Sequence, residues 1–196
     1  AFANLFVQSS VNSFDHVLVE GNSAAANADP LVYDMMAAFY TACSSFIAQN
    51  FGARKKKRIL QTYLICLFYS FITSLVLGVG IYLARYPFLY LFTSDKAVVE
   101  AGITRLSIMA LSYSASAFMD ASIAASRGLG KTAVPTFVVV MGSCVFRIIW
   151  IYTIFAYFHT IQSLYILYVF SWGITAIAEN IYFFHVYRHT LTGKTE

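Results

Sequence analysis

Five ionisable side chains lie inside long apolar stretches of this sequence: Asp34, Arg105, Asp120, Arg147 and Glu179. Charged groups in an apolar span usually face a protein interior or a wet cavity, and they often mark the path of an ion or a substrate. The sequence contains no combined serine, histidine and aspartate arrangement and no H-E-x-x-H pattern. These residues therefore predict binding and charge pairing inside a membrane, and nothing in the sequence argues for an enzyme.

Helix geometry predicts which of these charges share a depth. At about 1.5 Å per residue, Asp34 lies about 24 Å along its helix from Asn50, and Arg147 lies about 22 Å from Thr132. We therefore expect Asp34 and Arg147 to approach each other, directly or through water. Arg105 is expected nearer the outer boundary, where a long side chain reaches the headgroups.

Two carboxylates are expected at a second common depth. Asp120 lies about 9 Å, and Glu179 about 10 Å, from the inner ends of their helices. Two carboxyl groups at one level would suit a proton- or cation-coupled site. Tyr113 and Ser116 share the helical face of Asp120, and the small residues around it can line a polar path. The alternatives are that each carboxylate is satisfied separately by a hydroxyl group or water, and that the small residues serve packing alone.

The elements that hold these residues are predicted to be membrane helices. Of the 196 residues, 59% are hydrophobic and 11% are charged, whereas soluble domains carry about 25% charged residues. A bilayer core of about 30 Å needs roughly 20 apolar residues in a helix. We predict an all-α, polytopic membrane protein with one partial and five full spans, and the lipid bilayer as a partner. The spans are expected at residues 1–14 (which look truncated), 24–48, 59–84, 98–125, 134–157 and 161–186.

The basic residues predict the orientation of these spans, because cytoplasmic loops carry an excess of Lys and Arg. One basic run follows the second span and consists of Arg54, Lys55, Lys56, Lys57 and Arg58. Helix alternation brings four more basic residues to the same side: Arg127, Lys131, Arg188 and Lys194. The opposite connections contain the acidic residues Asp15, Glu20, Asp95 and Glu100. We therefore expect the basic loops and the C-terminus to be cytoplasmic.

The sequence gives little support to nucleotide binding, metal binding, redox chemistry or nucleic-acid binding. The sequence GLGKT at 128–132 ends like a phosphate-binding loop, but Ala125 stands where the first glycine is required. His185 and His189 have the spacing of a metal pair without an evident third ligand, and the three cysteines match no zinc or redox motif. The positive charge is local and is not spread over a face, so nucleic acid is not an expected partner. We expect no cofactor and no metal.

Five blocks of sequence together resemble the C-terminal half of a MATE-type (multidrug and toxic compound extrusion) transporter, closest to the bacterial DinF-like branch. The blocks are QSSVNSF at 8–14, GNSAA at 21–25, FIAQNFGA at 46–53 with its basic run, RGLG at 127–130 with Pro135, and GSCVFRIIW at 142–150. The resemblance covers nearly the whole chain, and the order and spacing of the blocks make it specific. The resemblance implies a fold of twelve helices in two six-helix lobes, of which this chain would form the C-terminal lobe, with the N-terminal lobe absent from the sequence.

The resemblance also implies a function, which is the export of cationic, amphipathic compounds by alternating access. The coupling ion would be H⁺ or Na⁺, moving in antiport, and the location would be a bacterial inner membrane. The missing N-terminal lobe and cationic small molecules would then be partners. Two alternatives stay open: a lipid-linked sugar flippase of related architecture, whose cavity should be richer in Arg and Lys, and a non-transporting membrane scaffold or half-length subunit.

A few residues receive roles from the resemblance and from their chemistry. The acid that the family often has on its tenth helix corresponds to Asp120, so Asp120, with Tyr113 and Ser116, is expected to bind the coupling cation or the substrate. The polar side chains of Gln8, Asn12 and Gln49 are also expected to face the cleft. The predicted pair of Asp34 and Arg147 is expected to order the lobe.

Overall fold

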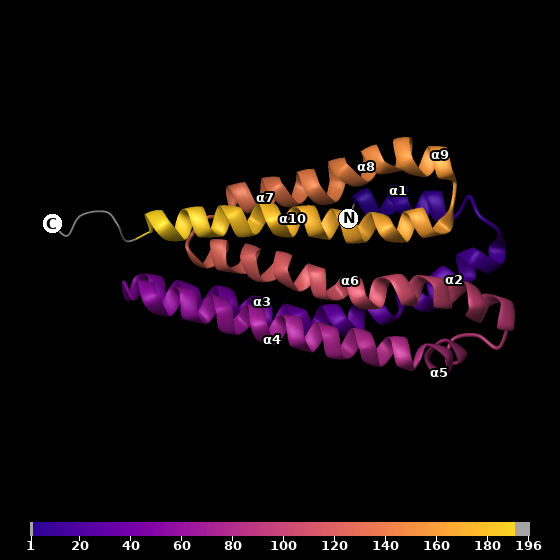
Figure 1. Cartoon of the computed structure of the whole chain (residues 1–196), viewed down its shortest axis with the longest axis horizontal. Helices are drawn as coiled ribbons and strands as arrows, with labels where there is room; N and C mark the ends of the chain where they lie inside the picture. The colour runs from indigo at the N-terminus through magenta and orange to yellow at the C-terminus, as the bar shows by residue number, and fades with distance from the viewer. Residues whose placement is uncertain (1, 191–196) are drawn as a thin grey trace.

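Long helices run side by side along one axis of the molecule in the computed structural model, which describes residues 2–190 (Figure 1). This part of the chain contains helices and no strand, so the predicted all-α fold is confirmed. Ten α-helices and two π-helical segments follow one another. They are α1 (Phe2–Val11), α2 (His16–Ala26), α3 (Ala28–Gly52), α4 (Lys56–Leu83), α5 (Arg85–Tyr90), α6 (Lys96–Gly128), α7 (Ala133–Val140), η1 (Met141–Val145), α8 (Phe146–Trp150), η2 (Ile151–Phe155), α9 (Ala156–Phe158) and α10 (Ile161–His189).

Within residues 2–190, five helical runs are long and apolar enough to cross a membrane. They cover residues 16–52, 56–83, 96–128, 133–158 and 161–189. The run at 133–158 joins α7, η1, α8, η2 and α9 into one rod of 26 residues, which is about 39 Å long at the rise of an α-helix. Large apolar side chains are exposed on the outside of these runs, among them Phe68, Phe137 and Ile177. Such a surface is suited to lipid rather than to water.

The helix α6 occupies the centre of the fold. The helices α2, α3, α4 and α10 all pack against it, and most of its residues are buried. Its buried residues include many serines and alanines, among them Ser112, Ser116, Ala121 and Ala125. Small side chains let helix backbones approach closely in a membrane. The sequence of α6 therefore fits a helix that is surrounded by others.

The structure differs from the prediction at residues 16–23, which were expected to form an outer loop. Asp15 caps the start of α2, since its carboxylate accepts a hydrogen bond from the backbone N–H of His16 at 2.8 Å. A Cβ added at Gly21 would lie 2.8 Å from the backbone nitrogen of Gly102 and 2.8 Å from the carbonyl oxygen of Val98. Gly21 thus permits close packing of α2 on α6, and it does not form a turn. The predicted start of the second span at residue 24 was too late for this reason.

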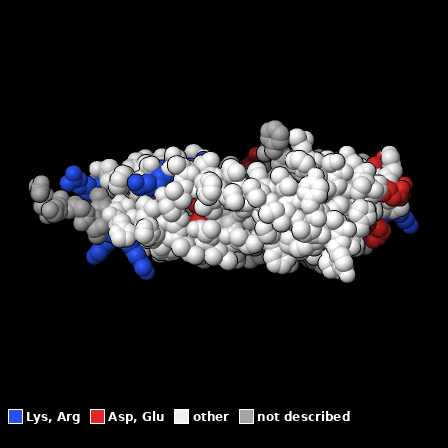
Figure 2. All heavy atoms as spheres, turned by 90° about the horizontal axis from the view of Figure 1, so that it is seen from above, with Lys and Arg blue, Asp and Glu red and all other residues white. Residues whose placement is uncertain are grey.

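Charge is divided between the two ends of the molecule. Figure 2 shows Lys and Arg gathered at one end, while Asp and Glu predominate at the other. The basic end is formed by the connection between α3 and α4, the connection between α6 and α7, and the end of α10 (Figure 1). Lys194, which was expected at this end, lies outside the described residues. The assignment of this end to the cytoplasm stays a prediction.

Candidate functional site

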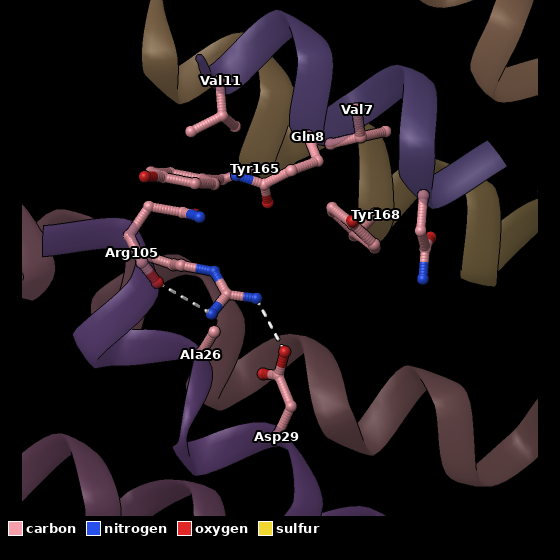
Figure 3. Close-up of a pocket in the computed structure, with 10 residues that line it drawn as sticks. Val7, Gln8, Val11, Ala26, Asp29, Arg105, Tyr165 and Tyr168 are labelled. Carbon is pink, nitrogen blue, oxygen red and sulfur yellow. Dashed lines mark hydrogen bonds and ion pairs between the residues drawn. The ribbon is translucent and has the colours of Figure 1, made fainter. Parts of the chain in front are cut away.

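A polar cavity of about 180 Å³ lies between α1, the junction of α2 and α3, α6 and α10 (Figure 3). Apolar side chains such as Val7 and Val11 form part of its wall. The polar part of the lining consists of Asn4, Gln8, Asn22, Asp29, Arg105, Tyr165 and Tyr168. A concave site of this kind, in which a few polar groups converge, is where a small ligand binds most readily.

An ion pair between Arg105 and Asp29 lies on one side of this cavity. The distance from Arg105 Nη2 to Asp29 Oδ2 is 2.7 Å, and the side chain of Arg105 is buried. The Tyr113 hydroxyl donates a hydrogen bond to the other carboxylate oxygen of Asp29, while Arg105 Nη1 reaches the backbone carbonyl of Asn22 at 3.5 Å. Each charge therefore has its opposite charge and further hydrogen bonds, which is the condition for a stable buried pair.

Arg147 stands behind the same cavity without an acidic partner. Its Nη1 donates to Asn4 Oδ1 at 2.8 Å, its Nε donates to Ser171 Oγ at 3.2 Å, and its guanidinium lies 4.4 Å from the centre of the Tyr168 ring. Asn4 and Tyr168 belong to the cavity lining. No carboxylate among residues 2–190 forms a salt bridge with Arg147. The surroundings of the cavity therefore carry an uncompensated positive charge.

The predicted pairing of Asp34 with Arg147 is wrong. Asp34 is exposed on α3, and it forms no salt bridge within the described part of the chain. The buried face of α3 includes Val32 and Met36, each two residues from Asp34. Because successive residues turn by about 100° around a helix, a residue two positions away points to nearly the opposite side. The prediction used depth along the helix and did not consider direction around it.

Asp120 lines a separate cavity of about 200 Å³ with residues of α3. Tyr33, Ala37, Tyr40 and Thr41 complete its lining. The Asp120 carboxylate is half-buried, and among the described residues it has no hydrogen-bond partner. It is therefore an acceptor that is both open to a ligand and flanked by aromatic rings.

The other residues that were predicted to bind with Asp120 form their hydrogen bonds elsewhere. The Tyr113 hydroxyl bonds to Asp29, and the buried Ser116 hydroxyl contacts the Met36 sulfur at 3.7 Å and the Tyr113 carbonyl at 2.9 Å. Tyr113 still reaches the Asp120 cavity indirectly, because its ring packs edge-on against Tyr33 at 6.4 Å. Tyr113 thus links the two cavities rather than joining Asp120 directly.

The three predicted cleft amides are placed differently. Gln8 lines the polar cavity (Figure 3). Its side-chain amide donates to Asn12 Oδ1 at 2.9 Å. Gln49 lies near the basic end of α3, where its amide reaches Ser45 Oγ at 3.5 Å, and it lines neither of the two cavities. The structure therefore brings Gln8 and Asn12 together and leaves Gln49 apart.

Asp29 is the main residue that the sequence analysis missed. It lies directly before Pro30, in the first turn of α3, and it was not among the five charges predicted inside the spans. The signal that would have found it is Arg105, a deep arginine that needs a partner. The expectation that the head group of Arg105 reaches the surface is also wrong, because this side chain is buried and paired with Asp29.

Comparison with known proteins gives a consistent result. The MatE family profile matches residues 1–153. The fold is similar to that of the Vibrio cholerae MATE transporter VcmN in its bent form, with a TM-score of 0.85 and 18% identity over 96% of this chain and 43% of that one. It is also similar to a MOP superfamily transporter from Pyrococcus furiosus, with a TM-score of 0.87 and 18% identity over 96% of this chain and 43% of that one. No curated protein matches the chain.

Proposed function

The chain belongs to the MatE family, and from this premise we propose that it forms one lobe of an alternating-access membrane transporter. It spans 43% of the length of each solved relative, so a second lobe of similar size would complete the path. We propose a bacterial inner membrane as the location, with the basic end of the lobe cytoplasmic. The lipid bilayer and the second lobe are the partners that this arrangement requires.

The face of α3 beside Asp120 is the proposed wall of the substrate path. Tyr33, Asp34, Ala37 and Thr41 are exposed there. Three of these residues line the cavity of Asp120, and Asp34 adds a second carboxylate to the same exposed stretch. A negative surface interleaved with aromatic rings fits a facing lobe across a wet cleft better than it fits lipid.

The residues around Asp120 give the main support for the proposed class of substrate. A carboxylate attracts a cation, and the rings of Tyr33 and Tyr40, which line the same cavity, favour cations over their faces. This arrangement supports export of cationic, amphipathic compounds, in exchange for H⁺ or Na⁺ that competes for the same carboxylate. Competition at one site gives antiport, because the ion and the substrate cannot both occupy Asp120.

A second candidate function is favoured by a different observation. Two buried guanidiniums, Arg105 and Arg147, stand beside the polar cavity, but in the described part of the chain only one carboxylate, Asp29, forms a salt bridge with either of them. An excess positive charge suits a substrate with an anionic group, such as a lipid-linked sugar. For the Pyrococcus furiosus relative, a reversed polarity of the binding pocket is described as suggesting a different function. A flippase of this architecture is therefore the alternative.

Transport in vesicles distinguishes these proposals. The transporter that contains this lobe is reconstituted, and efflux of a fluorescent cationic dye is measured under imposed proton or sodium gradients. Asp120→Asn should lower gradient-driven efflux at least tenfold, whereas Glu100→Gln, an exposed acid on the same helix, should leave it unchanged. Undiminished efflux in Asp120→Asn would reject the role of Asp120. Transport of an anionic lipid-linked sugar but of no cation would favour the alternative, and no transport at all would favour a scaffold.

A further inference from the structure

Glu179 is a fully buried acid on α10 that none of the functions above uses. Its exposed fraction is 0%, and neither of its carboxylate oxygens has a hydrogen-bond partner among the described residues. The hydroxyl of Ser126, also fully buried, is a second unpartnered group on the neighbouring α6. Buried polar groups are almost always hydrogen-bonded, so two exceptions on one pair of packed helices call for an explanation.

The surroundings of Glu179 are apolar. One turn before it, Ala176 packs in a buried cluster with Met119, Ile123 and the partly buried Val139 of α7. One turn after it, Phe183 packs in a second buried cluster. Because residues three and four positions apart share a helical face, Glu179 lies between the two clusters, where α10 meets α6 and α7.

Nearby hydrogen-bonding groups are already engaged. Asn180 accepts a hydrogen bond from the Tyr63 hydroxyl at 2.6 Å and donates to the Ala176 carbonyl at 2.8 Å. The Thr175 hydroxyl donates to the Ser171 carbonyl of its own helix at 2.7 Å. Asn180 and Thr175 therefore have hydrogen-bond partners other than Glu179, whereas the Ser126 hydroxyl has none among the described residues.

The charged and titratable groups that face Glu179 do not neutralise it. Arg127 of α6 acts on it electrostatically, but the guanidinium of Arg127 bonds to the Tyr40 hydroxyl at 2.8 Å and to Thr136 Oγ1 at 3.4 Å, and it forms no salt bridge with Glu179. Tyr182 is the titratable neighbour on α10 itself. The sequence of α7, AVPTFVVV, contains no titratable side chain. Glu179 thus lacks a counter-ion within salt-bridge distance in residues 2–190.

An ionised carboxylate without a partner is among the costliest groups to bury, so it must be neutralised by a proton or by a metal cation. A hard metal cation needs several oxygen ligands. The described residues contain no group of three or more acidic, histidine or cysteine side chains that could hold a metal. A proton needs only one carboxylate oxygen.

We propose that Glu179 is a proton-binding site enclosed between α6, α7 and α10, distinct from the site at Asp120. One proton adds to one carboxylate oxygen and leaves from it, and no other bond changes. The site accepts or releases its proton when these helices separate and admit water. The use of this proton in coupling rests on the proposed transport function, whereas the protonated state itself does not.

Infrared spectroscopy of the protein in lipid at neutral pH tests the proposal. A protonated carboxyl group gives a C=O band that shifts in D₂O. This band should be lost in Glu179→Gln and kept in Glu20→Gln, an exposed acid. A band that is unchanged in Glu179→Gln, or that disappears when Na⁺ replaces a bulky organic cation in the buffer, would overturn it.

Labelling provides a test that needs no variant, in case Glu179→Gln does not fold. In the unsubstituted protein, glutamate labelled with ¹³C at the carboxyl carbon should shift the protonated-carboxyl band, whereas labelled aspartate should not. A band that responds only to labelled aspartate would overturn the proposal. The spectrum does not depend on transport, so failure of the dye-efflux assay and failure of this assay are distinguishable.

Discussion

At the scale of single residues, the charged side chains within the lobe have different surroundings. Arg105 and Asp29 neutralise each other, Arg147 is held by neutral side chains, and Asp120 faces an open cavity. Glu179 has none of these arrangements. The roles proposed for these residues in structure, binding and proton exchange therefore follow from their different surroundings.

The ion pair of Arg105 and Asp29 leads to a prediction about stability. Asp29→Asn leaves a buried guanidinium without its counter-charge, which should cost up to about 3 kcal/mol. The double variant Asp29→Leu with Arg105→Met removes both charges and should recover much of this loss. Thermal unfolding of the purified protein in detergent measures both variants. A double variant that is as unstable as Asp29→Asn, or less stable than it, would contradict this prediction.

The sequence indicates where these residues lie along their helices, but it does not indicate the direction in which their side chains point. The apolar stretches of the sequence single out Asp120 and Glu179 as charges within predicted spans, and Glu179 is fully buried in the structure. Helix rise does not give the direction of a side chain around its helix, and this is why Asp34 was wrongly paired with Arg147. Direction depends on which neighbours pack on each face, and one sequence supplies no such contacts.

At the scale of the helices, close packing around α6 determines the shape of the lobe. Hydropathy predicts the long spans, because apolar length is a local property of the sequence. The helix α2 was missed because Gly21 and Asn22 resemble turn residues, whereas both are buried within a helix. A glycine that serves packing cannot be told from a glycine that serves a turn without the neighbouring helix.

The contact of α2 with α6 predicts a difference between two glycines. Gly21→Ala places a Cβ 2.8 Å from backbone atoms of α6, and such overpacking costs about 1–3 kcal/mol. Gly80→Ala in α4 meets nothing within 4 Å, and this substitution should be neutral or stabilising by about 0.5–1 kcal/mol. The melting temperature should fall for the first variant only. Equal melting temperatures would show that α2 does not pack closely on α6.

At the scale of the whole molecule, the division of charge between the two ends predicts its orientation (Figure 2). Lys57→Cys, at the basic end, should react with a membrane-impermeant thiol reagent only from the cytoplasmic side. Thr93→Cys, between α5 and α6 at the opposite end, should react only from outside. The protein without these substitutions gives the background from its own cysteines. The reverse pattern of labelling would invert the orientation of the lobe.

In the proposed transporter, the α3 face beside Asp120 lines a path that opens to one side of the membrane at a time. Ala37→Cys, an exposed position in the Asp120 cavity, reports this directly when labelling is measured from each side with the coupling gradient applied in either direction. We expect reversal of the gradient to move reactivity from one side of the membrane to the other, and we expect Asp120→Asn to abolish this change. Reactivity that stays on one side whatever the gradient would contradict this expectation.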